Sequence, residues 1–156
     1  MIKYPNLPFG YTSICDDIRH EADGKITLVG IYGTKLVASE FPITLPKLCF
    51  FITVNEETSA AGARDLNIYF EPEGSEGDDD RKILTSYSYE IPEEVVSDSN
   101  GKQFSMRSNT LEIIASPFRL EEEGKIRVRI NIGDDEYALG ALAVVLGNAF
   151  EETKIE

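Results

Sequence analysis

The feature that most constrains this fold is a hydrophobic alternation with a period of two residues, which returns along most of the chain. It is clearest over residues 125–132, where the apolar positions are Ile126, Val128, Ile130 and Ile132. A strand turns every second side chain toward the same face of a sheet, so this period indicates half-buried strands rather than helices. Gly, Asp, Asn and Pro interrupt the pattern repeatedly. The sequence therefore predicts an all-β fold, an antiparallel β-sandwich of about eight to nine strands with little helix.

The expected strands are bounded by turn residues. Asp23-Gly24 predicts a tight hairpin turn, because glycine readily takes a positive φ. Two prolines in 41–46 exclude a central strand, so this segment is expected to cross between sheets. A short helical turn is expected near 59–63 or at 92–96. A helix over 143–150 is an alternative to the end of the last strand. The expected strands are 9–21 (kinked near Asp16 and Asp17), 26–32, 34–39 at an edge, 48–54 with both faces buried, 64–70, 82–89, 109–114 with 118–120, 125–132 and 137–146.

Length and composition fit one folded domain, 1–156. The chain has 156 residues, of which 42% are hydrophobic, enough for a core of its own. It has no apolar run of membrane-spanning length, and its first residues lack the apolar block of a signal peptide. We therefore expect a cytoplasmic protein without membrane contact, in the host cytoplasm if a phage encodes it.

The charge is strongly acidic, with 28 Asp and Glu against 15 Lys and Arg and a net charge of −13. Direct binding to nucleic acid or to an anionic membrane needs basic patches, so both are disfavoured. The acids gather at 71–80, 90–98, 121–123, 134–136 and 151–156. If these segments meet on one surface, they can dock a basic groove or imitate a row of phosphates. The alternative is a solvated surface that keeps a β-protein soluble.

The sequence predicts no catalytic residue and no cofactor. His20 is the only histidine, and strand alternation places it on the face opposite Cys15, which is poor geometry for a nucleophile and its base. The chain has no Trp to form a sugar platform and no glycine-rich phosphate loop. Cys15 and Cys49 are read as buried structural thiols, since a disulfide needs an oxidising compartment and the spacing does not suit zinc.

Calcium is a further alternative, because it prefers several oxygen ligands on flexible loops. The chain has no EF-hand spacing, and a run of consecutive acids is also typical of a solvated loop. The calcium candidates are Asp78, Asp79, Asp80, Asp134 and Asp135.

Several motifs together resemble a family of uncharacterised bacterial and phage proteins of about 150 residues. They are the hairpin from Cys15-Asp16-Asp17 to Tyr32, the Pro-rich crossover from Phe41-Pro42 to Cys49, and a C-terminal hairpin that begins at Gly124. The match covers about two-thirds of the chain, and 71–102 does not match clearly. The resemblance implies a β-sandwich of unknown function and, through its occurrence in phages and mobile elements, an accessory or host-interaction role. It implies no catalytic residue.

The leading hypothesis is a non-enzymatic protein whose acidic surface engages a basic site on a host nucleic-acid-handling complex. The alternatives are an oligomerising structural module and a calcium-binding module, and the oligomeric state stays open. Asp16, Asp17, Arg19, Asp23 and Gly24 are expected to be structural; one of the two mid-strand acids needs a polar partner, and Asp17 shares a face with Arg19. Exposed Tyr and Arg, including Arg127 and Arg129, are favoured at interfaces, although cross-strand pairing with Glu is the simpler explanation and the one we favour. The candidate partner-binding residues are Glu71, Glu73, Glu76, Asp78, Asp79, Asp80, Asp134, Asp135, Glu136, Tyr87 and Tyr89.

Overall fold

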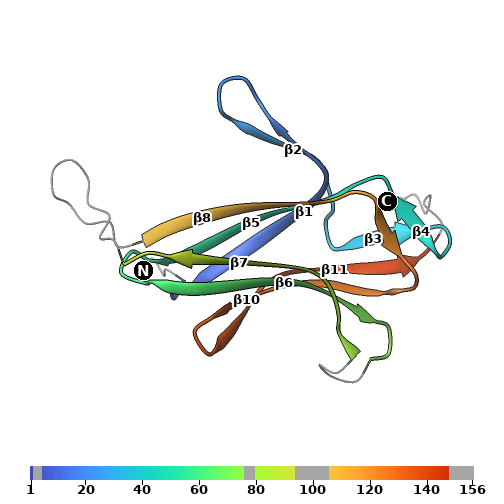
Figure 1. Cartoon of the computed structure of the whole chain (residues 1–156). Coiled ribbons are helices and arrows are strands. Elements are labelled where there is room, and N and C mark those ends of the chain that lie inside the picture. Colours follow the sequence, from blue (N-terminus) through green and yellow to red (C-terminus); the bar gives the residue numbers. More distant parts are fainter. Residues whose placement is uncertain (2–4, 76–79, 94–105, 148–156) are drawn as a thin grey trace.

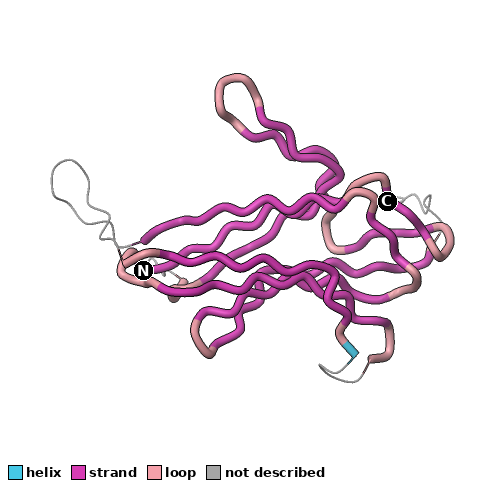
Figure 2. The backbone as a smooth tube through the Cα atoms, in the orientation of Figure 1, coloured by secondary structure: helices cyan, strands magenta, loops and turns pink. Residues whose placement is uncertain are grey.

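The computed structural model describes residues 1, 5–75, 80–93 and 106–147, and strands make up most of them (Figure 2). Two sheets of four and five strands pack face to face, and a two-stranded sheet lies beside them (Figure 1). The prediction of an all-β sandwich is confirmed. The nine strands of the two main sheets agree with the expected eight to nine, and the two short strands bring the described residues to eleven.

The four-stranded sheet has the order β2-β1-β5-β8, and every pairing in it is antiparallel. The end strands β2 and β8 leave one edge each without a strand partner among the described residues. The bounds are β1 (Phe9–His20), β2 (Ile26–Ile31), β5 (Leu48–Glu57) and β8 (Met106–Ala115).

The five-stranded sheet has the order β3-β11-β10-β6-β7. β3 pairs with β11 in parallel, which corrects the expectation of a purely antiparallel sandwich. The parallel pair arises because β3 joins this sheet at the far side of the last strand, as the edge strand that the sequence predicts. The bounds are β3 (Lys35–Ala38), β6 (Gly62–Pro72), β7 (Lys82–Ile91), β10 (Gly124–Ile132) and β11 (Asp135–Leu146).

The Pro-rich crossover contains a short strand, β4 (Ile43–Leu45), which pairs with β9 (Phe118–Leu120). β4 lies between Pro42 and Pro46 in sequence and stays out of both main sheets, in keeping with the missing backbone donors of these two prolines. The helical turn expected at 59–63 is instead a turn that leads into β6, and 143–146 belong to β11 rather than to a helix. Of 92–96 only Pro92 and Glu93 are described, and they are not helical. Within the described ranges, no helix is long and apolar enough to cross a membrane.

The core lies between the two main sheets. Ile126, Val128 and Ile130 of β10 are fully buried there, which confirms the face assigned by the alternation. The opposite sheet contributes Phe50 and Ile52 of β5, and Phe50 packs edge-on against Phe118 with ring centroids 6.5 Å apart.

The β1–β2 hairpin leaves the plane of its own sheet and projects away from the rest of the sandwich (Figure 1). We call residues 16–31 of this hairpin the arm. The pairing of β1 with β5 ends at Cys15 and Cys49, and beyond that point β1 pairs only with β2. Ile18 and Leu28 of the arm pack with Cys15, Cys49 and Phe51 as a second apolar cluster. This cluster covers the outer face of β5, so nearly all of β5 is buried on both faces, as predicted.

Strand alternation breaks where the arm leaves the sheet. Ile14 and Cys15 are adjacent yet both buried, and Ile18 shares the cluster of Cys15 rather than the opposite face. The acidic pair lies at this point, where the sequence predicted a kink. His20 is exposed and lies 2.8 Å from Glu112 of β8, not against a cysteine. Both thiols are free, and burial raises the pKa of each.

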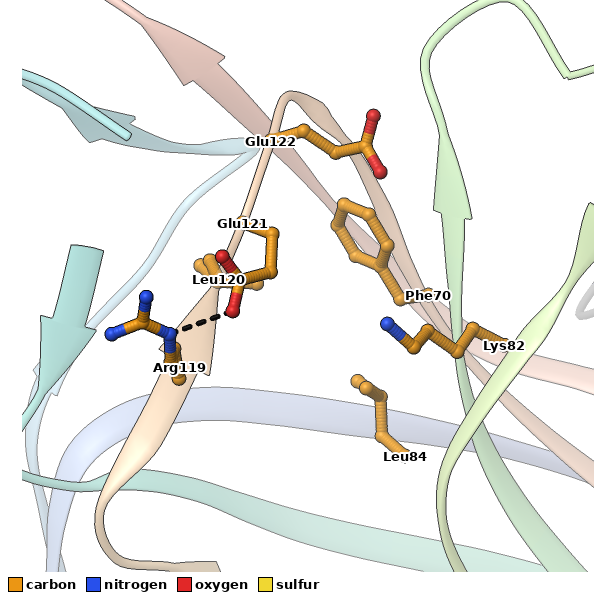
Figure 3. Close-up of a pocket in the computed structure, with 7 residues that line it drawn as sticks. All are labelled: Phe70, Lys82, Leu84, Arg119, Leu120, Glu121 and Glu122. Carbon is orange, nitrogen blue, oxygen red and sulfur yellow. Dashed lines mark hydrogen bonds and ion pairs between the residues drawn. The ribbon is translucent and has the colours of Figure 1, made fainter. Parts of the chain in front are cut away.

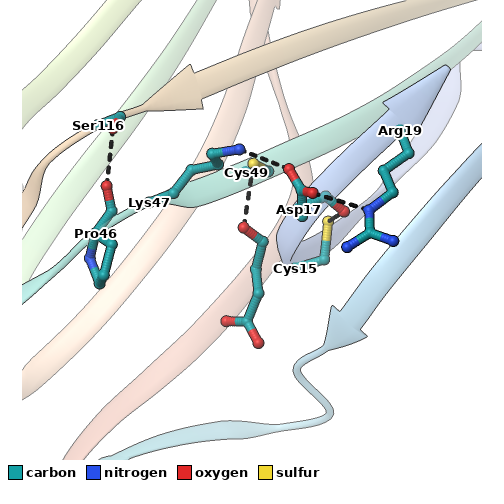
Figure 4. Close-up of polar contacts among 8 residues, drawn as sticks. Cys15, Asp17, Arg19, Pro46, Lys47, Cys49 and Ser116 are labelled. Atoms are coloured by element: carbon teal, nitrogen blue, oxygen red, sulfur yellow. Dashed lines mark hydrogen bonds and ion pairs between the residues drawn. The ribbon is translucent and has the colours of Figure 1, made fainter.

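Both members of the acidic pair have a polar partner, although neither is buried, whereas the sequence predicted an inward-facing acid with a partner at only one of the two positions. Lys47 Nζ lies 2.6 Å from one oxygen of Asp17, and Arg19 Nε lies 3.1 Å from the other (Figure 4). These contacts hold the pKa of Asp17 below its usual range. Asp16 accepts a 2.7 Å hydrogen bond from the hydroxyl of Tyr32, and burial followed by this bond raises the pKa of Tyr32. The Asp23-Gly24 turn closes the arm, with φ of 82° at Gly24.

Candidate functional site

An open, acid-lined cleft lies where the β6–β7 turn meets the loop between β9 and β10. Its volume is about 360 Å³, and we call it the acidic cleft. The two loops are joined through the backbone, because the N–H of Glu73 donates to the carbonyl of Glu123 at 3.0 Å. The hydroxyl of Ser75 donates to the carbonyl of Pro72 at 2.9 Å and so fixes the turn. The lining residues are Pro72, Glu73, Gly74, Ser75, Asp80 and Glu122.

The three carboxylates of the acidic cleft have no ion-pair partner among the described residues. They are Glu73, Asp80 and Glu122, and all three residues are exposed. Glu71, the nearby acid of β6, is different: Arg127 contacts its carboxylate and thereby lowers the pKa of Glu71. The cleft therefore carries a local excess of negative charge that Arg127 does not neutralise.

A smaller cavity of about 40 Å³ adjoins the acidic cleft, and Glu122 lines both (Figure 3). Phe70, Leu84 and Leu120 give it apolar walls, while Lys82 lies at one side. Arg119 donates to Glu121 at 2.6 Å and lowers the pKa of that carboxyl. An apolar hollow beside free carboxylates suits a side chain with an aliphatic stem and a cationic end, such as Lys or Arg.

The sequence left open whether the acidic segments meet on one surface, and two of them lie at opposite ends of the five-stranded sheet. Asp134 and Asp135 lie in and directly after the β10–β11 turn, beside Ile132, which pairs with Arg64 at the start of β6. The acidic cleft lies at the other end, where Gly124 pairs with Pro72. Glu76, Asp78 and Asp79 lie outside the described residues.

The same separation applies to the calcium candidates. Asp80 is at the end of the sheet opposite Asp134 and Asp135, so these three carboxylates do not surround one ion. In the part of the chain that the structure describes, no group of three or more His, Cys, Asp or Glu side chains is arranged to hold a metal ion.

The arginines that the sequence offered as interface anchors pair with acids on the outer face of the five-stranded sheet. Arg127 contacts Glu71, and Arg129 lies 3.8 Å from Glu136, which is also 3.7 Å from Arg81. These contacts favour the explanation by pairing with Glu. Glu136 is therefore partly neutralised, unlike the acids of the acidic cleft.

The two candidate tyrosines share a face of β7, with ring centroids 6.0 Å apart, as predicted. Tyr87 is 50% exposed and remains accessible at this edge. Tyr89 is half-buried, and its hydroxyl has no hydrogen-bond partner in the described part of the chain. Burial, followed by the nearby Glu56, raises the pKa of Tyr89 to about 12.

Sequence reasoning missed a buried ion pair at the end of the sandwich away from the acidic cleft. Arg64 Nε donates to Glu56 at 2.6 Å, and the two side chains are 2% and 1% exposed. Arg64 Nη1 also donates to the carbonyls of 61–63, and Asn109 donates to the second oxygen of Glu56. Glu56 adjoins a second open cleft of about 250 Å³. The one available signal was position, because Glu56 and Arg64 each continue a core-facing row of alternate residues, two positions from Val54 and Leu66 respectively.

Comparison with known proteins identifies a family but no activity. Residues 10–145 match the model of a family of unknown function, DUF6941. No curated protein matches the chain. Similar solved structures include a β-glucosidase from Listeria innocua in complex with gluconolactone, with 10% identity and a TM-score of 0.40 over 91% of this chain and 17% of that one. An uncharacterised protein from Bacillus anthracis has 13% identity and a TM-score of 0.33 over 72% of this chain and 85% of that one. The chain thus spans a small part of the β-glucosidase.

Proposed function

We propose that this chain, which belongs to the DUF6941 family of unknown function, is a non-enzymatic module that binds a basic protein through the acidic cleft. The observation that carries the proposal is that Glu73, Asp80 and Glu122 line one open cleft, while no ion pair to these three carboxylates is found among the described residues. The adjoining apolar cavity supports it, because it provides a place for the stem of a Lys or Arg side chain.

The physical basis is charge complementarity. The solvated carboxylates of an open cleft form charge-assisted hydrogen bonds with an incoming guanidinium or ammonium group. The net charge of −13 adds long-range attraction, which raises the association rate of a basic partner and makes binding weaker as salt increases.

The more specific proposal is that the partner belongs to a bacterial nucleic-acid-handling complex and that the protein inhibits it. Proteins that hold DNA or RNA present Lys and Arg to the phosphates, so their binding grooves are natural docking sites for an acidic protein. The acidic composition and the family resemblance to phage proteins support this version.

The test is a charge reversal in the acidic cleft. Glu73→Lys combined with Asp80→Lys should abolish salt-sensitive recovery of a partner from bacterial lysate, and should also abolish binding of a lysine-rich peptide measured by calorimetry. Both positions are exposed, so the variant is expected to fold.

The matched control is Asp134→Lys combined with Asp135→Lys. It changes the net charge by the same amount at the opposite end of the sheet. Binding that survives in the control and is lost in the cleft variant supports the proposal. Equal loss in both variants would mean that net charge alone matters, and unchanged binding in the cleft variant would refute the acidic cleft as the site.

A further inference from the structure

The edge strand β8 is long and regular, and it lacks the features that usually prevent an edge strand from pairing with another chain. It pairs with β5 over ten consecutive residues without a register shift, and its other side has no strand partner among the described residues. Its sequence, MRSNTLEIIA, contains no Pro or Gly and only two charged residues. Such an edge exposes unpaired backbone N–H and C=O groups, which is a template for another strand.

The other three edges of the two main sheets carry features that oppose pairing. β3 has only four residues and begins with Lys35. β2 belongs to the projecting arm and contains Gly30 at a φ of 66°. β7 begins with Lys82, and its pairing with β6 shifts register between Ile68 and Tyr69. Because the other three edges have features that oppose pairing, β8 is the edge of the two main sheets best suited to pair with another strand.

The outward row of β8 is nearly symmetrical about its centre. The inward row includes Leu111 and Ile113, which pair with Ile52 and Phe50 of the core side of β5. On the outer row, Met106 and Ile114 are 47% and 52% exposed. Read along the strand, this row runs Met106, Ser108, Thr110, Glu112, Ile114, so an apolar residue stands at each end of a polar centre.

We propose that β8 pairs with β8 of a second copy of this chain, antiparallel and two-fold symmetric, with Thr110 at the centre. In this register Met106 lies opposite Ile114 of the partner subunit, and the two-fold symmetry repeats this apolar contact at the other end of the paired strands. Directly opposite side chains in antiparallel strands contact each other, and residues of the same row remain on the same face. The two four-stranded sheets then form one continuous sheet across a two-fold axis. Two-fold symmetric dimers are the commonest closed oligomers.

A single cysteine tests the register. Thr110→Cys places two thiols directly opposite each other, at a Cα separation of about 4.5–5.5 Å, which a disulfide can span. Ser108→Cys is the matched control, because in this register its two copies are roughly 13 Å apart along the strands. Mild oxidation should therefore link the Thr110→Cys chains covalently and leave the Ser108→Cys chains unlinked. The native cysteines are fully buried and should not interfere.

Light scattering tests the contact without an added thiol. The wild type should have twice the 17.4 kDa mass of one chain, and Met106→Lys combined with Ile114→Lys should lose the dimer because like charges face each other. Ile83→Lys combined with Leu146→Lys is the control, since these residues are 61% and 54% exposed on other strands and the dimer should persist.

Three results would overturn the proposal: a monomeric wild type, equal linking of the two cysteine variants, or a dimer that survives the lysine pair on β8. The cleft variant Glu73→Lys with Asp80→Lys lies away from β8 and should remain dimeric, so this test is independent of the proposed binding function.

Discussion

Removing one partner of the buried Glu56–Arg64 pair should be among the most damaging single changes in this protein. In Glu56→Leu, the guanidinium of Arg64 stays 98% buried but loses its carboxylate, while Asn109 loses the oxygen to which it donates. The carbonyls of 61–63 still accept from Arg64 Nη1 but carry no countercharge. The substitution thus leaves an unpaired buried charge, which is costly.

The size of the effect follows from the geometry. Two unit charges about 4 Å apart attract each other by about 4 kcal/mol at the effective dielectric constant of about 20 that suits protein sites. Breaking one side of a buried pair costs about 3–5 kcal/mol in general, which agrees. A domain of this kind is stable by only about 5–15 kcal/mol, so Glu56→Leu should remove a large fraction of its stability.

The assay is urea unfolding followed by circular dichroism, because the chain has no Trp. Glu56→Leu combined with Arg64→Met removes both charges and fills the space with apolar groups. Replacing a buried ion pair in this way is often neutral, so the double variant should be more stable than Glu56→Leu alone. Glu57→Leu, at the exposed neighbouring position, is the control and should change the free energy of unfolding by less than about 0.5 kcal/mol.

Two outcomes would refute this reasoning. One is a loss of less than about 1 kcal/mol in Glu56→Leu, which would mean that water reaches the guanidinium. The other is a double variant no more stable than Glu56→Leu, which would mean that the pair is not the source of the cost.

Two further predictions concern the arm. Lys47→Met should raise the pKa of Asp17 toward its ordinary value in an NMR titration; since contacts lower this pKa in the fold, their stabilisation is present at neutral pH and is lost as pH falls below about 4. Gly30→Ala should destabilise by more than about 1 kcal/mol, because φ is 66° and a Cβ would collide with the Asp16 carboxylate, whereas Gly33→Ala meets nothing within 4 Å. An unchanged Asp17 pKa, or equal unfolding midpoints for the two alanine variants, would contradict these accounts.

The parts of the fold that sequence predicts well are those set by local chemistry. The faces of β10 follow from its strict alternation, and the first turn follows from Asp23-Gly24. The Pro-rich segment stays out of the main sheets because proline lacks a backbone donor, which is also a property of the residues themselves.

The parts that sequence misses depend on where a strand lies relative to its neighbours. A period of two indicates that side chains alternate between the faces of a strand. It does not indicate that β1 continues beyond the end of its pairing with β5, where the strand changes direction and Ile18 joins Cys15 in one cluster. Likewise, nothing local shows that Glu56 and Arg64 approach each other from different sheets. Nor does anything local show that Glu73 and Asp135 lie at opposite ends of the five-stranded sheet.

The parallel pairing of β3 with β11 has a consequence for the order in which the chain acquires its structure. β3 occupies residues 35–38, and its only strand partner among the described residues is residues 143–146, so most of the sequence separates the two. Closing so long a loop is entropically costly and comes late. On the ribosome, β1, β2 and β5 emerge close together and are free to pair, while β3 has to wait for β11. Sheet closure at that edge therefore cannot precede the synthesis of β11.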